Sequence, residues 1–452
     1  MTPSHITSHS PGQQTNELSP RGAEQDARQV TADDHTIAPS EIAVGVIIGR
    51  ASEYFDFFVY AIASVLVFPT VFFPFEDRLE GTLWSFVIFS FAFIARPIGS
   101  VLFMWIQHRW GRGVKLTGAL FLLGVSTASI AFLPSYATLG AWSIVLLSVF
   151  RFLQGIALGG SWDGLPSLLA LTARKNRRGW YAMIPQLGAP IGFIIAASLF
   201  LYLNSQLPAK DFLEWGWRYP FYVAFAINVV ALFARLRLVV TAEYERLLKK
   251  NELEPSPIRE LVAARGSNLF IGAFAALASY ALFHLVTVFP LSWITLYSSQ
   301  SVNDVLQVQI IGAFIAIVGV IASGRIADKF GRRNTLGTLA VLIGIFSFAA
   351  PALLGGNVFS EDVFILVGFA LLGLSYGQAA GAVTSNFEPR FRYTGAALTS
   401  DLAWLIGAAF APLVALGLSA HFGLIFMGGY LLSGAICTLV ALRVNKALEI
   451  RG

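Results

Sequence analysis

The chain has 452 residues, of which 56% are hydrophobic and only 13% are charged, and its formal net charge is +5. Because soluble domains carry about 25% charged residues, these values exclude a water-exposed surface over most of the chain and, with it, an ordinary soluble enzyme. The single cysteine, Cys437, excludes an intramolecular disulfide and a multi-cysteine metal site.

The first segment, residues 1–40, is polar and rich in Ser, Thr, Gln and Pro. It has no apolar period, so its composition predicts a disordered tail. The residues after Met1 lack the basic-then-apolar start that marks a secretory signal. We therefore expect the first apolar segment to remain in the protein.

Twelve stretches after this tail are long and apolar enough to cross a membrane as helices, which takes about 20 residues each. They are apolar nearly all round, whereas the strands of a membrane barrel would alternate. The sequence therefore predicts an all-α membrane protein. The expected spans are 42–68, 82–107, 115–134, 141–171, 180–204, 218–239, 267–290, 306–327, 335–354, 362–384, 394–419 and 422–443.

The distribution of Lys and Arg predicts the orientation, because cytoplasmic loops carry an excess of these residues. With a cytoplasmic amino terminus, 25 of the 31 basic residues fall in cytoplasmic tails and loops. We therefore expect a multi-pass protein of the plasma (inner) membrane with both termini in the cytoplasm. The six exceptions are Arg50, Arg96 and Arg151 inside spans and Arg78, Lys210 and Arg218 on the other side.

The longest polar stretch after the tail, residues 240–266, divides the spans into two sets of six. We interpret it as a central cytoplasmic loop. The expected domains are an amino-terminal bundle at 41–239 and a carboxy-terminal bundle at 267–443, followed by a short cytoplasmic tail at 444–452.

The two halves carry a related motif at the same place. The second span runs into HRWGRG at 108–113, and the eighth runs into GRIADKFGRR at 324–333. Both motifs fall on the cytoplasmic side, so the repeat is parallel. Parallel halves of this kind are a known plan among secondary transporters.

The second motif resembles the loop motif of the major facilitator superfamily. The first copy retains Arg109, Gly111 and Arg112 but has Met104 and His108 where the family usually has Gly and Asp. We expect this first gating loop to be weaker than the second. The matching residues of the second copy are Gly324, Asp328, Lys329, Gly331, Arg332 and Arg333.

Six further segments resemble the metabolite:proton symporter branch of that superfamily, which includes transporters of α-ketoglutarate, shikimate and proline or betaine. The resemblance covers about residues 40–443. The segments are EYFDFFVY at 53–60, IARPIGS at 94–100, RFLQGIALGG at 151–160, PQLGAPIG at 185–192, EWGWRYPF at 214–221 and RYTGAALT at 392–399.

The resemblance implies two six-helix bundles that transport a small polar metabolite by alternating access, driven by a proton. The substrate would be an organic acid or a zwitterionic, amino-acid-like osmolyte. We expect no cofactor, metal or nucleic acid, and the lipid bilayer surrounds the protein. Because a single chain holds both halves, a monomer is expected. An uncoupled facilitator or exporter, and a transporter-like sensor, stay open as alternatives.

Charged residues inside a span are costly and usually functional. Arg50, Glu53 and Asp56 follow one another at intervals of three and share a helix face. Arg50 and Glu53 can neutralise each other, whereas Asp56 has no cation in its own helix. We expect Asp56 to carry the coupling proton, with Glu53 as second choice and Arg151 assisting. The alternative is that Asp56 pairs permanently with Arg96 or Arg151.

Arg96 is expected to hold a substrate carboxylate, because a guanidinium group can bind one through two parallel hydrogen bonds. Asp163 and Asp401 would add negative charge to the same cavity, which favours a zwitterionic or cationic substrate. His284 is interpreted as a hydrogen-bonded interior histidine rather than a proton relay. The expected cavity walls, which packing alone also explains, are Tyr54, Tyr60, Gln186 and Trp404.

Overall fold

The computed structural model describes residues 39–162, 164, 166, 169, 177–239, 246, 253–384 and 387–444, and every regular element among them is helical. The predicted terminal tails lie almost entirely outside the described residues, and so does Asp163.

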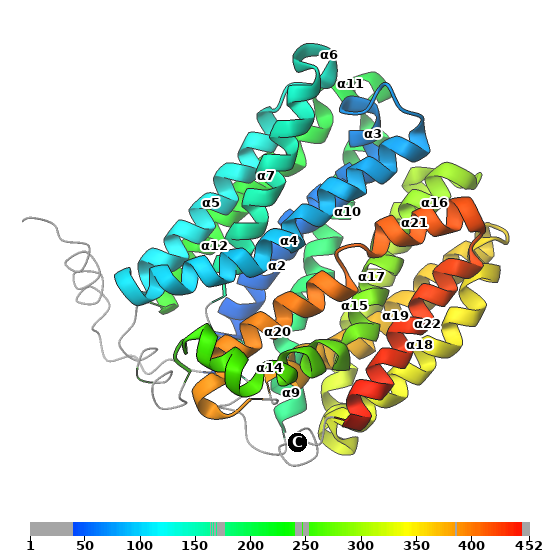
Figure 1. The fold of residues 1–452 in the computed structure, drawn as a ribbon. Helices are drawn as coiled ribbons and strands as arrows, with labels where there is room; N and C mark the ends of the chain where they lie inside the picture. Colours follow the sequence, from blue (N-terminus) through cyan, green and yellow to red (C-terminus); the bar gives the residue numbers. More distant parts are fainter. Residues whose placement is uncertain are drawn as a thin grey trace, which may run out of the picture.

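The first half of the chain runs from the blue to the green helices of Figure 1 and forms one side of the molecule. Its elements are α2 (Pro39–Leu66), α3 (Phe68–Val71), α4 (Arg78–Trp110), α5 (Arg112–Phe132), α6 (Tyr136–Leu139), α7 (Ala141–Gly160), α9 (Arg178–Met183), η2 (Ile184–Leu187), α10 (Gly188–Gln206), α11 (Ala209–Glu214), η3 (Gly216–Arg218) and α12 (Tyr219–Val239).

The second half, from green to red in Figure 1, forms the other side. Its elements are α14 (Ile258–Ala275), α15 (Leu277–Thr287), α16 (Phe289–Tyr297), α17 (Val302–Phe330), α18 (Arg332–Leu354), α19 (Val358–Thr384), η4 (Pro389–Phe391), α20 (Arg392–Gly407), α21 (Ala411–Phe422) and α22 (Ile425–Val444).

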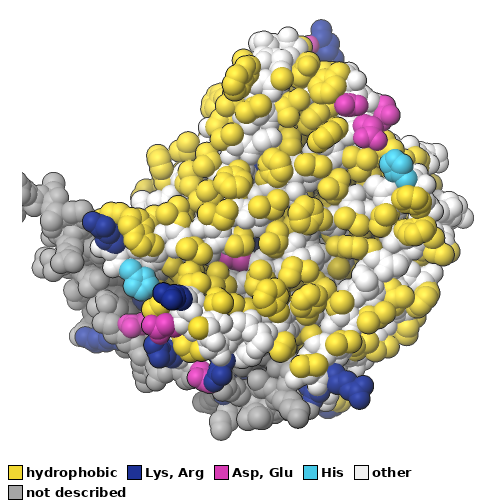
Figure 2. Space-filling model, in the orientation of Figure 1, with side chains coloured by type: hydrophobic (Ala, Val, Ile, Leu, Met, Phe, Trp, Pro, Cys, Tyr) yellow, Lys and Arg dark blue, Asp and Glu magenta, His cyan; other side chains and the backbone are white. Residues whose placement is uncertain are grey.

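Eleven helical segments of the described part are long and apolar enough to cross a membrane. The remaining predicted span, the first in the chain, is α2, which is long enough but carries Arg50, Glu53 and Asp56 and packs against α10 and α12. On the face shown in Figure 2, hydrophobic side chains cover the middle of the molecule, and most visible charged side chains lie toward its ends. The predicted all-α membrane architecture is confirmed.

Several predicted boundaries differ from the observed helices. The fourth span was expected to reach residue 171, but α7 ends at Gly160. Helix α14 begins at Ile258, inside the stretch predicted as the central loop. The seventh predicted span is interrupted at Ala276 and Val288, and the eleventh between Gly407 and Ala411. Pro290 and Pro412 come just after the breaks at Val288 and Phe410 and lack the N–H group that would continue the helix there.

The same helix pair forms the closest crossing in each half, α4 with α7 and α17 with α19. Glycine makes this approach possible. A Cβ atom on Gly155 would lie 2.2 Å from the carbonyl oxygen of Ala92, and one on Gly373 would lie 2.4 Å from that of Ala316. The repeat seen in the sequence is therefore a repeat of packing.

The two loop motifs have matching backbone geometry as well. Gly111 ends α4 and precedes α5 with a φ angle of +91°, and Gly331 does the same between α17 and α18 with +83°. Each glycine N–H closes the preceding helix, on Gln107 and Ala327 respectively. Glycine adopts this left-handed region at little cost. We refer to the end of the molecule that carries 108–113 and 324–333 as the motif end.

Candidate functional site

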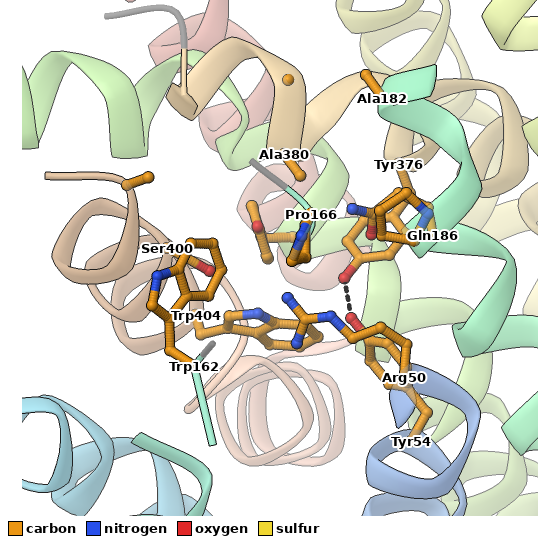
Figure 3. A pocket seen from close by; sticks show the side chains of 14 residues that line it. Arg50, Tyr54, Trp162, Pro166, Ala182, Gln186, Tyr376, Ala380, Ser400 and Trp404 are labelled. Atoms are coloured by element: carbon orange, nitrogen blue, oxygen red, sulfur yellow. Dashed lines mark hydrogen bonds between the residues drawn. The ribbon is translucent and has the colours of Figure 1, made fainter. Parts of the chain in front are cut away.

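A cavity between the two halves collects polar and aromatic side chains from both. In Figure 3, Arg50 and Tyr54 of α2, Tyr376 of α19 and Trp404 of α20 point toward a common space. Three of the four predicted wall residues, Tyr54, Gln186 and Trp404, line it. Tyr60 does not, because it is fully buried against Arg151. Other lining residues are Trp162, Tyr280 and Ser400.

Aromatic rings form much of the contact between the halves at this cavity. The hydroxyl groups of Tyr54 and Tyr376 are hydrogen-bonded to each other across the interface (Figure 3). The ring centroids of Tyr280 and Trp404 are 5.0 Å apart, and those of Tyr54 and Trp404 are 6.2 Å apart. Such walls are apolar on their faces and offer hydroxyl groups at their edges, which suits a small polar solute.

Glu53 is shared by two arginines. Its carboxylate accepts from Arg50 at 2.9 Å and from Arg235 at 2.7 Å, and Arg235 also donates to the carbonyl oxygen of Ser161. Arg235 was counted among the basic residues of the cytoplasmic loops, and that was wrong, because it is buried in α12 with 5% of its surface exposed. Arg50, one of the two arginines, also lines the cavity.

Arg96 and Asp401 form an ion pair between the halves. The Nε atom of Arg96 in α4 donates to Asp401 in α20 at 2.7 Å, and the hydroxyl of Ser100 donates to the other carboxylate oxygen. From the sequence, Arg96 was expected to bind a substrate carboxylate and Asp401 to add negative charge to the cavity. In the structure each neutralises the other, because both lie in an apolar interface where an unpaired charge is costly.

Asp56 accepts three hydrogen bonds from neutral side chains. The donors are Thr127 at 2.6 Å and Gln154 and Asn228, each at 3.4 Å, and Asn228 is itself held by Ser52 at 2.8 Å. Within the described part of the chain, no basic side chain lies within 4.0 Å of this carboxylate. The alternative of a permanent ion pair with Arg96 is wrong, since Arg96 is paired with Asp401.

Arg151 is completely buried in the same region. It donates to Gln154 at 3.1 Å and to the carbonyl oxygen of Phe89 at 3.3 Å, and its guanidinium carbon lies 4.0 Å from the ring centre of Tyr60. Its second terminal nitrogen has no hydrogen-bond partner. Gln154 therefore connects Arg151 to Asp56 without direct contact between the two charges.

His284 projects from α15 of the second half into aromatic rings of the first. Its ring stacks on Phe57 at a centroid distance of 5.3 Å and meets the edge of Phe89 at 5.4 Å. Both ring nitrogens are buried without a hydrogen-bond partner. The expectation of a hydrogen-bonded histidine was wrong, because rings surround this side chain where a polar partner was expected.

The second loop motif joins the halves at the motif end. The carboxylate of Asp328 accepts from the backbone N–H groups of Gly179 at 2.6 Å and Trp180 at 3.2 Å, at the start of α9. These N–H groups have no partner inside the helix. Arg332 donates to the carbonyl oxygens of Gly381 at 3.0 Å and Arg178 at 3.4 Å, so the motif contacts both halves.

The other residues of this motif pack against neighbouring helices or face the surroundings. Gly324 lies against α9, where a Cβ atom would come within 3.0 Å of the backbone of Trp180. Lys329 is exposed, and Arg333 donates to the carbonyl oxygen of Leu442 at 3.0 Å.

The first motif makes different contacts. Nδ1 of His108 lies 2.8 Å from the carbonyl oxygen of Met104 in its own helix, so this side chain does not reach the other half. Arg109 is exposed beside two tryptophans, and Arg112 is half-buried. Lys115 instead connects the halves: its ammonium group donates to the hydroxyl of Tyr393 at 3.1 Å.

Sequence reasoning paired Arg50 with Glu53 without giving it a substrate contact, and it missed Lys115 and Arg235 as buried cations. It also missed the neutral polar residues around Asp56, whose only signal was a polar side chain inside an apolar span. Among the described residues, no three His, Cys, Asp or Glu side chains come together as metal ligands.

Comparison with known proteins gives a consistent result. Residues 84–412 match the sequence profile of the Major Facilitator Superfamily. The inner membrane metabolite transport protein YhjE of Escherichia coli is 37% identical over 409 residues, covering 89% of this chain and 93% of that protein. The citrate-proton symporter of Klebsiella pneumoniae is 27% identical, covering 87% of this chain and 88% of that protein. Other relatives transport shikimate or proline and betaine.

Among solved structures, a D-xylose-proton symporter superposes with a TM-score of 0.69 at 19% identity, covering 90% of this chain and 97% of the other. This likeness establishes the shared fold. The relatives are transport proteins rather than enzymes, and together with the profile match they show that this chain is a multi-pass membrane transporter of the Major Facilitator Superfamily.

Proposed function

We propose that this protein is a secondary active transporter that imports a small metabolite bearing a carboxylate together with a proton. The substrate is an organic acid or a zwitterion of amino-acid or betaine type. The observation that carries the proposal is the cavity between the halves, which the guanidinium group of Arg50 lines. The same helix carries Asp56, a buried carboxylate that is held by neutral hydrogen-bond donors.

The position of Arg50 supports a carboxylate. Among the described residues, its guanidinium group donates to Glu53 through one nitrogen, and Arg50 faces the cavity. A guanidinium with spare donors is well suited to a carboxylate. Arg50 thus replaces Arg96 as the proposed anchor, with Tyr54, Gln186 and Trp404 around it. Asp163, predicted as a further substrate contact, lies outside the described residues.

The surroundings of Asp56 support proton coupling. A buried carboxylate held only by neutral donors can be neutralised by taking up a proton, whereas Glu53 is already neutralised by two arginines. Moving one net charge across the membrane costs about 2.3 kcal/mol per 100 mV, so a carrier gains by returning neutral. Arg151 would act through Gln154, which contacts both residues.

Alternating access then consists of two bundles, 41–239 and 267–443, moving about the cavity. The contacts of Asp328 and Arg332 hold the motif end closed and must break when it opens. One chain supplies both bundles, so we propose that the monomer transports. An uncoupled facilitator or an exporter would share this fold. Transport in proteoliposomes with an imposed pH gradient, described below, distinguishes these alternatives from the proposal.

We further propose that the motif end faces the cytoplasm. Arg235 and Lys115 are buried, but removing both from the 25 basic residues assigned to that side leaves 23 against three. A fluorescent reporter that matures only in the cytoplasm, fused after Gly452, should be bright, and an alkaline phosphatase fusion at the same place should be inactive. The reverse pattern would overturn the orientation.

The coupling role of Asp56 is tested with Asp56→Asn, an isosteric mimic of the protonated side chain. The ligand is first found by thermal-shift screening of purified protein against organic acids, betaines and amino acids, because a specific ligand stabilises the folded state. In proteoliposomes, Asp56→Asn should exchange labelled ligand at a rate close to that of the wild type. It should lose accumulation driven by a pH gradient.

Arg50→Met is the matched contrast, because it should abolish the thermal shift itself and with it both exchange and accumulation. If Asp56→Asn still concentrates the ligand when the pH gradient is imposed, another residue carries the proton. If the wild type equilibrates the ligand without responding to the gradient, the protein is an uncoupled facilitator.

The asymmetry of the two gating motifs is tested by hydrogen–deuterium exchange. Asp328→Asn removes the charge that holds the amides of Gly179 and Trp180, so exchange in a peptide covering 178–183 should become faster by at least about tenfold, as expected for the loss of roughly 1.5–3 kcal/mol. His108→Ala should leave that peptide unchanged. Equal acceleration by both variants would contradict the asymmetry.

A further inference from the structure

A layer of aromatic rings lies between the central cavity and the end of the molecule opposite the motif end. We refer to this opposite end, which carries α6 and α16 (Figure 1), as the far end. The rings of Phe57, Phe93 and Trp404 line a second lobe of the cavity, of about 420 Å³, which shares lining residues with the first. Along α15, His284 lies one turn farther toward the far end than Tyr280, which lines the first lobe. The proposed transport mechanism uses neither this layer nor His284.

His284 completes the layer from the second half. Its ring centroid lies 5.3 Å from that of Phe57, 5.4 Å from Phe89, 5.8 Å from Phe93 and 6.1 Å from Trp404. The side chain is fully buried, and neither ring nitrogen has a hydrogen-bond partner within the described part of the chain. In water both nitrogens are hydrogen-bonded, so burial here costs free energy. The closed far end therefore holds a polar group that would gain by leaving the layer.

Arg151 makes the same surroundings unfavourable for a charged imidazole. Its guanidinium carbon lies 5.7 Å from the ring centre of Phe57 and 4.9 Å from that of Phe89, the two rings that His284 also contacts. Among the described residues, the other helices packed on α15 add no further charged group that acts on His284. A proton on His284 would therefore place two cations against the same pair of rings, and nearby like charges disfavour the charged form.

We propose that His284 is a proton-dependent gate residue: the far end closes only while this imidazole is neutral, and a proton on it holds the far end open. The inference rests on the alternating access of the proposed function, because the halves must separate at the far end. Once they separate, water reaches the ring, and a hydrated imidazole takes up a proton near pH 6.5. The ring must return this proton to the water before the far end closes. Acid therefore favours the open arrangement, and the closed arrangement loses stability as the pH falls below about 6.5.

The test measures the width of the far end directly, by double electron–electron resonance on the full chain in an uncharged detergent, without ligand or pH gradient. Spin labels are attached at Ala137→Cys and Ser299→Cys, which are exposed positions of the two halves at the far end, in a Cys437→Ala background. The ratio of the long to the short label distance should rise about 30-fold from pH 8 to pH 5. This is the rise for one proton that binds near pH 6.5 in the open arrangement only.

His284→Gln and His284→Phe should both remove the rise, because neither new side chain takes up a proton. His284→Phe suits the aromatic layer and keeps the test valid if His284→Gln disturbs folding. The matched control is His421→Gln, which replaces an exposed histidine of α21 at the far end and should keep the full rise.

A labelled parent that shows no rise, a rise that survives in both His284 variants, or loss of the rise in His421→Gln would overturn the proposal. Loss of the rise in Asp56→Asn would assign the pH response to Asp56 and would overturn it as well. Because no transport is measured, a failure of proton-coupled import appears in the proteoliposome test and leaves this one unaffected.

Discussion

The cost of burying charge in an apolar interior governs the contact between the two halves. Arg96 and Asp401 come from helices on opposite sides of the molecule and meet at 2.7 Å in a largely aromatic interface. Separating them leaves two buried charges without partners, and removal of one member of such a pair costs about 3–5 kcal/mol. The halves can therefore separate here only when water or another charged group replaces the partner that each of these two side chains loses.

The same cost explains how the charges of the first half are arranged. Glu53 holds two arginines, whereas Asp56 and Arg151 are kept apart by Gln154. In the first arrangement the carboxylate of Glu53 is fully paired, and Arg50 still lines the cavity. In the second, Asp56 is held by amide and hydroxyl groups, which can reorient when its carboxylate takes up a proton. The proposed division of labour between substrate anchor and proton carrier follows from this difference.

The sequence was sufficient for the architecture, because twelve apolar stretches and a repeated loop motif are local signals. The site was only partly predictable. Its polar residues could be identified, but Arg96 finds its partner 305 positions later in the chain, and no spacing rule connects the two. Arg235 looks like a loop residue because other basic residues follow it. The break at Ala276, between α14 and α15, could not be predicted, because neither a glycine nor a proline stands at that position or next to it.

A double-mutant cycle on Arg96 and Asp401 tests most directly whether this ion pair holds the halves together. The apparent Tm is measured for Arg96→Met, Asp401→Asn and the double variant in the same detergent. Each single variant leaves one buried charge unpaired and should lower the Tm clearly. The account predicts that the double variant loses much less than the sum of the two single losses, because no lone charge remains. Additive losses would show that the two residues act independently and would contradict the account.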